Sequence, residues 1–170
     1  MSHYRRVRVP GGCYFFTLVT RNRAPVFQGS AEVEVLRAAL RRVIAARPFR
    51  IHAMVVLPDH LHCIWQLPRG DADFSGRWRE IKKSVSRQLL RPGQTPATLW
   101  QPRFWEHLLR DEDDWRRHLD YIHYNPVKHG LAESPWAWPW SSFHHCVTLG
   151  WYEPDWGASE PGAIAGMNLE

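Results

Sequence analysis

The spacing of apolar side chains along this chain alternates between the period of strands and that of helices. Residues 12–20 (GCYFFTLVT) are aromatic and β-branched, which is typical of a buried strand. Residues 31–46 repeat apolar side chains at helical spacing behind Ser30, a candidate N-cap. Residues 49–57 are apolar on both faces, which favours a central strand. Residues 60–67 follow directly after the turn pair Pro58-Asp59, so we expect these two strands to form an antiparallel hairpin.

The second half of the chain repeats this alternation and then changes character. A second helix ending at Pro92-Gly93 is marked by the buried stripe Phe74, Trp78, Ile81, Val85 and Leu89. Residues 104–110 predict a short last strand. Four acidic residues, 111–114, suit the N-terminus of a third helix, whose packed side is formed by Trp115, Leu119 and Ile122. Beyond Gly130 the chain is rich in tryptophan and proline, and residues 157–170 are expected to be a flexible tail.

The predicted order of elements is strand, helix, strand, strand, helix, strand, followed by an extra helix. This order is that of the ferredoxin-like, split βαβ plan of the α+β class. In that plan both helices cover one face of an antiparallel sheet. We therefore expect a single catalytic domain over residues 1–156, with its chemistry on the open face, a C-terminal helix and an aromatic tail.

Composition narrows the class of protein. The apolar fraction of 44% and the charged fraction of 23% are ordinary for a globular domain, so disorder and a coiled coil are excluded. No apolar run approaches the ~20 residues of a membrane span. The three cysteines are widely spaced, which does not suggest disulfides and makes the cytoplasm the expected location. The net charge of +5 and ten tryptophans favour a nucleic-acid partner, although a mildly basic protein with a Trp-rich core would have the same composition.

Two histidines are the first candidates for chemistry. His60 and His62 are two residues apart on a predicted strand, so both side chains project from the same face. Two imidazoles at this spacing can chelate one divalent metal ion. Paired histidines on a strand are more often surface or hydrogen-bonded residues than metal ligands.

The third helix supplies the next candidates. Tyr121 and Asn125 are four residues apart, hence on one helix face. Pro126 follows Asn125 and is expected to end or kink the helix there. A tyrosine hydroxyl can act as a nucleophile if its phenolate is stabilised. The alternative is that Tyr121 is a packing residue and Asn125 a helix C-cap.

Two longer strings and several short ones make the chain resemble a known family. Residues 53–62 read AMVVLPDHLH and residues 121–131 read YIHYNPVKHGL; shorter stretches lie at residues 4–6 (YRR), 12–17 (GCYFFT), 100–107 (WQPRFWEH) and 138–143 (WPWSSF). Taken in this order, these stretches resemble the REP-associated tyrosine transposases, which are members of the HUH single-tyrosine transposase superfamily. The resemblance extends from near the N-terminus to about residue 156. The family usually has Met at the place of Leu57 and a small hydroxyl residue at that of Cys13, and neither position is expected to touch catalysis.

The resemblance implies a role for each of the four candidate residues. His60 and His62 would be the metal-binding pair, Asn125 the third metal ligand and Tyr121 the nucleophile. The implied cofactor is a divalent cation, Mg²⁺ or Mn²⁺, and imidazole ligands suit Mn²⁺ somewhat better. The implied activity is that of a single-strand DNA endonuclease and strand transferase, acting on repetitive extragenic palindromic hairpins through a 5′-phosphotyrosine intermediate. Its partners would be single-stranded and hairpin DNA.

Basic side chains are the candidates for contact with DNA. They are the N-terminal arm of Arg5, Arg6 and Arg8, and Lys82, Lys83 and Arg87 on the polar face of the second helix. A solvated surface explains them equally, because exposed helix faces are normally charged. The segment 136–140 either belongs to the core or folds over the active-site face as a cover. Two other functions stay open: a catalytically inactive hairpin-binding protein on the same scaffold, and a metal-dependent hydrolase that activates water with His60 and His62.

Overall fold

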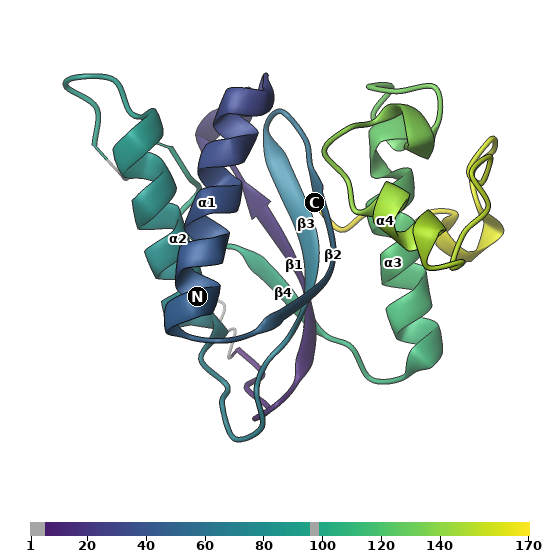
Figure 1. Cartoon of the computed structure of the whole chain (residues 1–170), viewed down its shortest axis with the longest axis horizontal. Coiled ribbons are helices and arrows are strands. Elements are labelled where there is room, and N and C mark those ends of the chain that lie inside the picture. The colour runs from purple at the N-terminus through teal and green to yellow at the C-terminus, as the bar shows by residue number, and fades with distance from the viewer. Residues whose placement is uncertain (1–5, 96–98) are drawn as a thin grey trace.

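The sheet of this protein has four antiparallel strands with a helical layer on each side (Figure 1). The computed structural model describes residues 6–95 and 99–170. Its strands are β1 (Cys13–Val19), β2 (Arg50–Val56), β3 (His60–Gln66) and β4 (Trp105–Leu108), in the spatial order β2-β3-β1-β4. This order, with helices α1 (Ser30–Ala46) and α2 (Phe74–Leu89) in the two crossovers, confirms the predicted ferredoxin-like plan.

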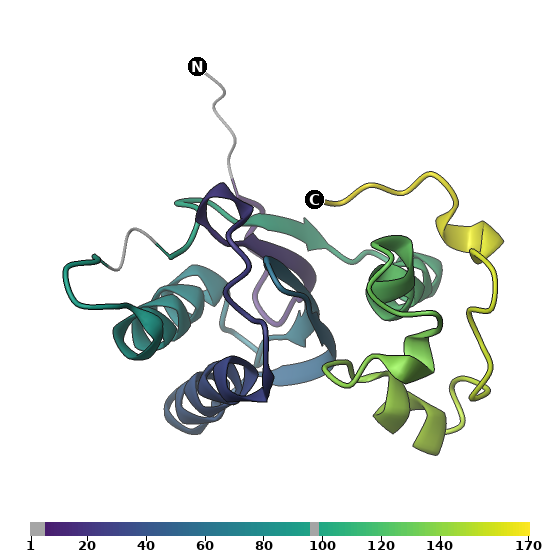
Figure 2. The same ribbon diagram turned by 90° about the horizontal axis from the view of Figure 1, so that it is seen from above.

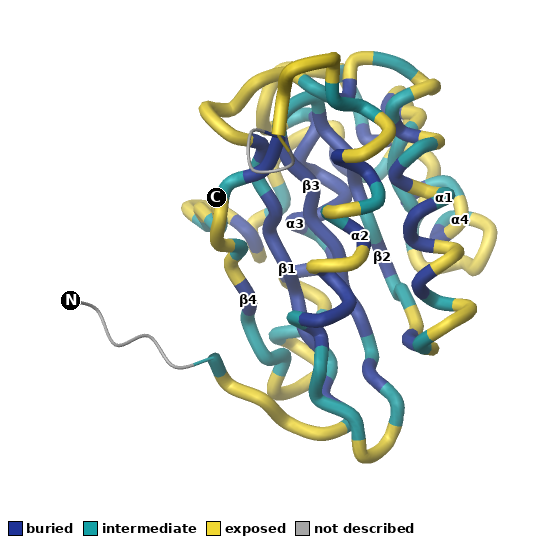
Figure 3. Tube along the Cα trace, turned by 90° about the vertical axis from the view of Figure 1, so that its left-hand side faces the viewer, coloured by how far each residue is buried: buried dark blue, intermediate teal, exposed yellow. Residues whose placement is uncertain are grey.

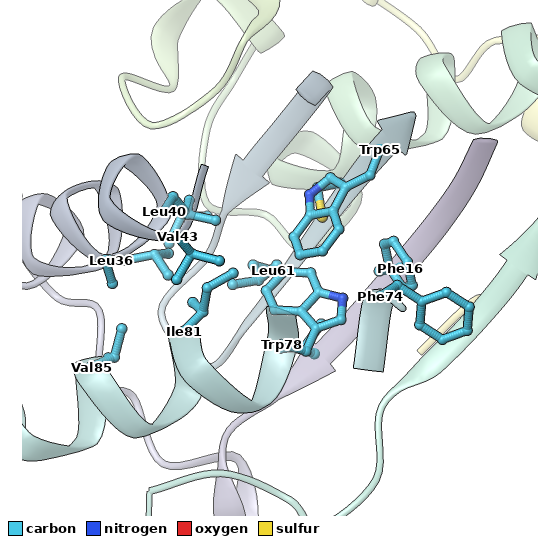
Figure 4. Packing of buried hydrophobic residues seen from close by; sticks show 14 of the residues in the cluster. Phe16, Leu36, Leu40, Val43, Leu61, Trp65, Phe74, Trp78, Ile81 and Val85 are labelled. Atoms are coloured by element: carbon cyan, nitrogen blue, oxygen red, sulfur yellow. The ribbon is translucent and has the colours of Figure 1, made fainter. Parts of the chain in front are cut away.

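Helices α1 and α2 pack on one face of the sheet, where the larger of two hydrophobic clusters lies (Figure 4). β3 contributes alternate side chains to it, and the predicted stripe of α2 packs against them, with Trp78 stacked on Trp65 at 4.0 Å between ring centroids. The side chain of Asp73 caps the start of α2 by accepting a hydrogen bond from the Gly76 amide. The helix-covered face is therefore the one that the sequence predicts.

Strand β2 lies at an edge of the sheet, so the prediction that it is central is wrong. Its apolar side chains on both faces are explained by what covers it. The amide of Val56 donates a hydrogen bond to the carbonyl oxygen of Trp140, and Val55 forms an isolated bridge with Ser141. The chain after residue 139 thus pairs with the outer edge of β2, which a sequence pattern cannot distinguish from a neighbouring strand.

Helix α3 (Glu112–Lys128) packs on the other face of the sheet, opposite α1 and α2 (Figures 1 and 2). Leu119 and Ile122 are buried in the second cluster, as predicted, together with Ile64 of β3. The helix continues through Pro126 for two further residues, so of the two expected outcomes at Asn125, an end or a kink, the end is wrong. Proline removes only one amide donor, and the carbonyls of the last turn accept bonds from His129, Gly130 and Leu131.

The C-terminal part forms three short helical pieces: η3 (Pro135–Ala137), α4 (Phe143–Thr148) and η4 (Gly162–Ile164). Trp138 is buried and its indole donates to the carbonyl of Val56, so this part of the segment 136–140 packs in the core beside β2, whereas Trp136 is 48% exposed. The last residues pass over α3 and return toward the sheet (Figure 2). Ile164 is buried in the second cluster, and the mobility of residues 157–170 stays a prediction.

The most deeply buried strands are β1 and β3, which lie side by side in the middle of the sheet (Figure 3). All seven residues of β1 pair with β3, so Thr17 stands opposite His62 and Val19 opposite His60. Within the part of the chain that the structure describes, no helix has the length and apolar character that crossing a bilayer demands.

Candidate functional site

His60 and His62 project from β3 toward α3, on the face that α1 and α2 leave free. Their exposed fractions are 1% and 0%, which excludes the surface alternative. The two rings lie 5.0 Å apart between centroids. Burial lowers the pKa of both imidazoles, although the neighbouring carboxylate of Asp59 opposes this for His60. The neutral imidazole, which is the metal-binding form, is therefore favoured at both positions.

Hydrogen bonds to the Nδ1 atoms fix which ring nitrogen is free. His60 Nδ1 lies 2.6 Å from the carboxylate of Asp59, so it carries the proton and donates. Thr17 donates its hydroxyl proton to the carbonyl oxygen of Leu169, so it accepts from His62 Nδ1 at 2.8 Å. Assigned in this way, both histidines have a lone pair on Nε2. Hydrogen bonding of this kind is what orients histidine ligands in metal sites.

Asn125 of α3 faces the same two nitrogens. Its side-chain oxygen lies 3.3 Å from His60 Nε2. His62 Nε2 and Asn125 Nδ2 are buried, and neither has a hydrogen-bond partner among the residues that the structure describes. Buried polar atoms without a partner are costly, and an ion at this point would satisfy the imidazole. Two imidazole nitrogens and one amide oxygen thus fit a divalent cation.

Tyr121 lies one turn before Asn125, and its ring is edge-on to that of His62 at 5.3 Å between centroids. The side chain is 1% exposed, so it is both packed and placed at the histidine pair. The phenol oxygen accepts a hydrogen bond from Lys128 Nζ at 3.0 Å and one from the Leu169 amide at 3.2 Å. Burial raises the pKa of Tyr121, and these two donors lower it.

The last residues of the chain occupy the approach to this phenol. Tyr121 donates to a carboxylate oxygen of Glu170 at 3.2 Å, and the same oxygen lies 2.6 Å from His129 Nε2. Burial raises the pKa of Glu170, but the hydrogen bond and charge of His129 outweigh it, and the pKa falls well below its usual value. His60, His129 and Glu170 therefore form a second set of potential ligands at the same place.

The structure brings together all four predicted residues, His60, His62, Tyr121 and Asn125, and adds others that sequence reasoning missed. Asp59 was assigned only to a turn, although its place directly before His60 is a signal. Thr17 could be found only from the register of β1 against β3. The contacts of Lys128, His129 and Glu170 depend on the course of the chain after Pro126, which no local pattern reveals.

The predicted DNA-binding residues do not converge on this site. Arg6 forms an ion pair with Glu106 at 2.8 Å, Arg8 contacts Ser75, and Lys82 donates to the carbonyl of Gln101. Lys83 and Arg87 line a groove between α1 and α2, on the far side of the sheet from the histidines (Figure 1). Arg5 lies outside the described residues. Contact of these side chains with DNA stays a prediction.

Comparison with known proteins places this fold in a transposase family. The family model described as "Transposase IS200 like" matches residues 9–109. A REP-associated tyrosine transposase of Escherichia coli (strain K12) is 47% identical over 169 residues, 99% of each chain. A relative from Haemophilus influenzae, assigned to the same group, is 40% identical over 98% of this chain and 99% of its own.

A solved structure of a relative has the same fold. The structure of a REP-associated tyrosine transposase bound to a REP hairpin has a TM-score of 0.84 and 47% identity, and the match covers 96% of each chain. The chain therefore belongs to the IS200-like transposases and, among them, to the REP-associated tyrosine transposases.

Proposed function

We propose that this transposase is a metal-dependent single-strand DNA endonuclease and strand transferase that forms a 5′-phosphotyrosine intermediate. The observation that carries the proposal is the convergence of one phenol, two imidazole Nε2 atoms and one amide oxygen in a single buried place between β3 and α3. Tyr121 is the nucleophile in this proposal, and His60, His62 and Asn125 hold the cation.

The cation would be Mg²⁺ or Mn²⁺, and when bound it supplies Lewis-acid polarisation of the scissile phosphate. The residues of the chain do the remaining work. Asp59 and Thr17 hold the two imidazoles in the tautomer that leaves Nε2 free. Lys128 places a positive charge 3.0 Å from the phenol oxygen, where negative charge develops as the proton leaves.

The reaction replaces one phosphate ester bond by another, so the energy of the broken bond is kept in the new one. The phenol oxygen of Tyr121 attacks phosphorus, a tyrosyl–phosphate bond forms, and the bond from phosphorus to the 3′ oxygen breaks. The 3′ oxygen takes up a proton and leaves as a hydroxyl group. Attack by a second 3′ hydroxyl on the tyrosyl phosphate reverses these changes and joins two strands without ATP.

The proposed substrate is a repetitive extragenic palindromic hairpin with a single-stranded flank. The solved relative is described as bound to a REP hairpin, and the match to that chain is nearly complete. The net charge of +5 suits a phosphate backbone. The protein would act in the cytoplasm on both single-stranded and hairpin DNA.

The alternative of a catalytically inactive hairpin-binding protein is favoured by one observation. In this structure the amide of Leu169 and the carboxylate of Glu170 already contact the phenol oxygen that would attack DNA. Binding to a hairpin does not need that oxygen, whereas the transferase does. The three candidate functions differ in whether DNA is cleaved and in whether Tyr121 becomes covalently bound to it. Only the transferase does both, the hydrolase cleaves without a covalent bond, and the inactive protein does neither.

The deciding experiment compares Tyr121→Phe with Tyr124→Phe. The protein is incubated with labelled hairpin DNA and Mn²⁺ and run on a denaturing gel. We expect a covalent protein–DNA band from the natural chain and from Tyr124→Phe, and none from Tyr121→Phe, whose hairpin affinity stays unchanged. Cleavage without a covalent band would indicate the hydrolase, and binding without cleavage would indicate the inactive protein.

A further inference from the structure

A second cluster of metal-binding side chains lies where strand β4 meets the first turns of α3. His107 comes from β4, Asp114 from the first turn of α3, and His118 from the turn after it. One ligand atom from each residue lies within 4.8 Å of the other two. We propose that these three residues form a second metal site, which binds a divalent transition-metal ion such as Zn²⁺ and is separate from the catalytic cation.

The distances within the cluster are those of groups that can share one ion. His107 Nε2 lies 2.8 Å from one carboxylate oxygen of Asp114, and His118 Nδ1 lies 3.1 Å from the other. Two imidazoles and a carboxylate form a mixed nitrogen and oxygen donor set of the kind that Zn²⁺ uses, with the remaining position taken by water. Mg²⁺ and Ca²⁺ prefer oxygen ligands, so this set selects against them.

When no ion is bound, hydrogen bonds connect the three residues of the cluster. His107 Nε2 shares its proton with the carboxylate, and His118 Nδ1 donates to the backbone carbonyl of Asp114 at 2.7 Å. Binding needs a shift of the ring proton to the other nitrogen in both histidines.

The surroundings of the cluster attract a cation and give it access. A hollow of about 560 Å³ opens beside the three residues. Asp111 and Asp113 also line it, so three carboxylates face two guanidinium groups, those of Arg110 and Arg117. This balance of charge favours a metal ion over a DNA phosphate as the occupant.

The proposed site is distinct from the catalytic residues and bears on their position. The ring of Phe15 lies between the two, 5.4 Å from the ring of His62 and 4.8 Å from that of His118. Strand β4 pairs with β1 alone, at the edge of the sheet. An ion shared by His107 and α3 would therefore tie this edge strand to the helix that carries Tyr121.

The test is the number of Zn²⁺ ions that the full chain binds at pH 7, measured by isothermal titration and by metal analysis after dialysis. We expect two ions for the natural chain. Asp114→Asn should lose one of them, with its affinity weakened more than tenfold. The matched control is Asp113→Asn, which removes the same charge from the same helix turn and the same hollow but should keep both ions.

Two further variants keep the test decisive. If Asp114→Asn does not fold by circular dichroism, His107→Gln on the edge strand takes its place, with the same expected loss. His60→Gln removes a ligand of the catalytic cation, and should still bind one Zn²⁺ that raises its melting temperature. The inference is overturned if His60→Gln binds no Zn²⁺, or if the variants of the cluster keep as many ions as Asp113→Asn. Neither result depends on whether the protein cleaves DNA.

Discussion

At the scale of single residues, two side chains that are not themselves proposed ligands orient the histidine pair for the proposed metal ion. Asp59 and Thr17 hold the Nδ1 atoms of His60 and His62, and so leave both Nε2 atoms free. Loss of either partner would let the ring rotate or change tautomer. Loss of a partner of this kind typically weakens metal affinity about 10- to 100-fold.

Asp59→Ala is expected to weaken metal binding without removing a ligand. The carboxylate that fixes His60 would be lost, so the Mn²⁺ concentration needed for half-maximal formation of the covalent band should rise about 10- to 100-fold. Saturating Mn²⁺ should restore most of the band. Arg23→Ala is the control, because it leaves the bond of Asp59 to His60 and removes the ion pairs of Arg23 with Asp59 at 3.2 Å and with Glu170 at 3.7 Å. An unchanged Mn²⁺ requirement in Asp59→Ala would refute the role of this carboxylate.

These residues also show how far the sequence predicts the site. His60 and His62 follow from the two-residue period of a strand, and Tyr121 and Asn125 from the four-residue spacing of a helix. Thr17 is separated from His62 by 45 residues and meets it only through the register of two paired strands. Local patterns therefore find groups that share one element, and miss groups that the sheet brings together.

At the scale of elements, the continuation of α3 through Pro126 places the ammonium group of Lys128 at the proposed nucleophile, Tyr121. Lys128 lies seven residues after Tyr121, which is two helix turns, and its Nζ atom reaches the phenol oxygen only because the helix persists. The sequence predicts the helix and its packed face, but not this end. A proline disfavours the helical conformation of the residue before it without forbidding it. Here the packing of α3 in the second hydrophobic cluster stabilises the helical conformation.

Replacement of Lys128 is expected to change the pH dependence of cleavage. Burial raises the pKa of Tyr121 and Lys128 lowers it, so Lys128→Met should raise it further. Because the reactive phenolate increases with pH, the rising limb of the pH–rate profile should move to higher pH, with a rate about tenfold lower at pH 7.5.

The matched variant Lys128→Arg keeps the charge near the phenol, and its profile should stay close to that of the natural chain. Single-turnover rates of covalent band formation are measured for both variants from pH 6 to above pH 10, because burial raises the pKa of Tyr121 from its usual value. A profile of Lys128→Met that falls in height but keeps its midpoint would show that Lys128 does not act on the ionisation of Tyr121.

At the scale of the whole molecule, the site is assembled from four parts of the chain, of which β3 supplies His60 and His62. β1 supplies Thr17, α3 supplies Tyr121, and the last residues supply Leu169 and Glu170. The sequence predicts residues 157–170 only as a flexible tail, because nothing in their composition indicates where they pack. In the proposed mechanism DNA needs the same phenol oxygen, so we expect the tail and a DNA strand to compete for one place.

Removal of residues 167–170 is therefore expected to speed cleavage. The segment is held at the site by hydrogen bonds from Thr17 and Lys128 and by those of Leu169 and Glu170 to the phenol. A hydrogen bond contributes about 1 kcal/mol net, and DNA regains part of this by bonding the same groups, so the gain should be about tenfold. Glu170→Gln should give a smaller gain. Glu160→Gln, which changes an exposed carboxylate elsewhere in residues 157–170, should give none. Single-turnover formation of the covalent band at fixed Mn²⁺ measures all three, and a slower reaction in the truncated chain would show that these residues assist the chemistry instead of competing with DNA.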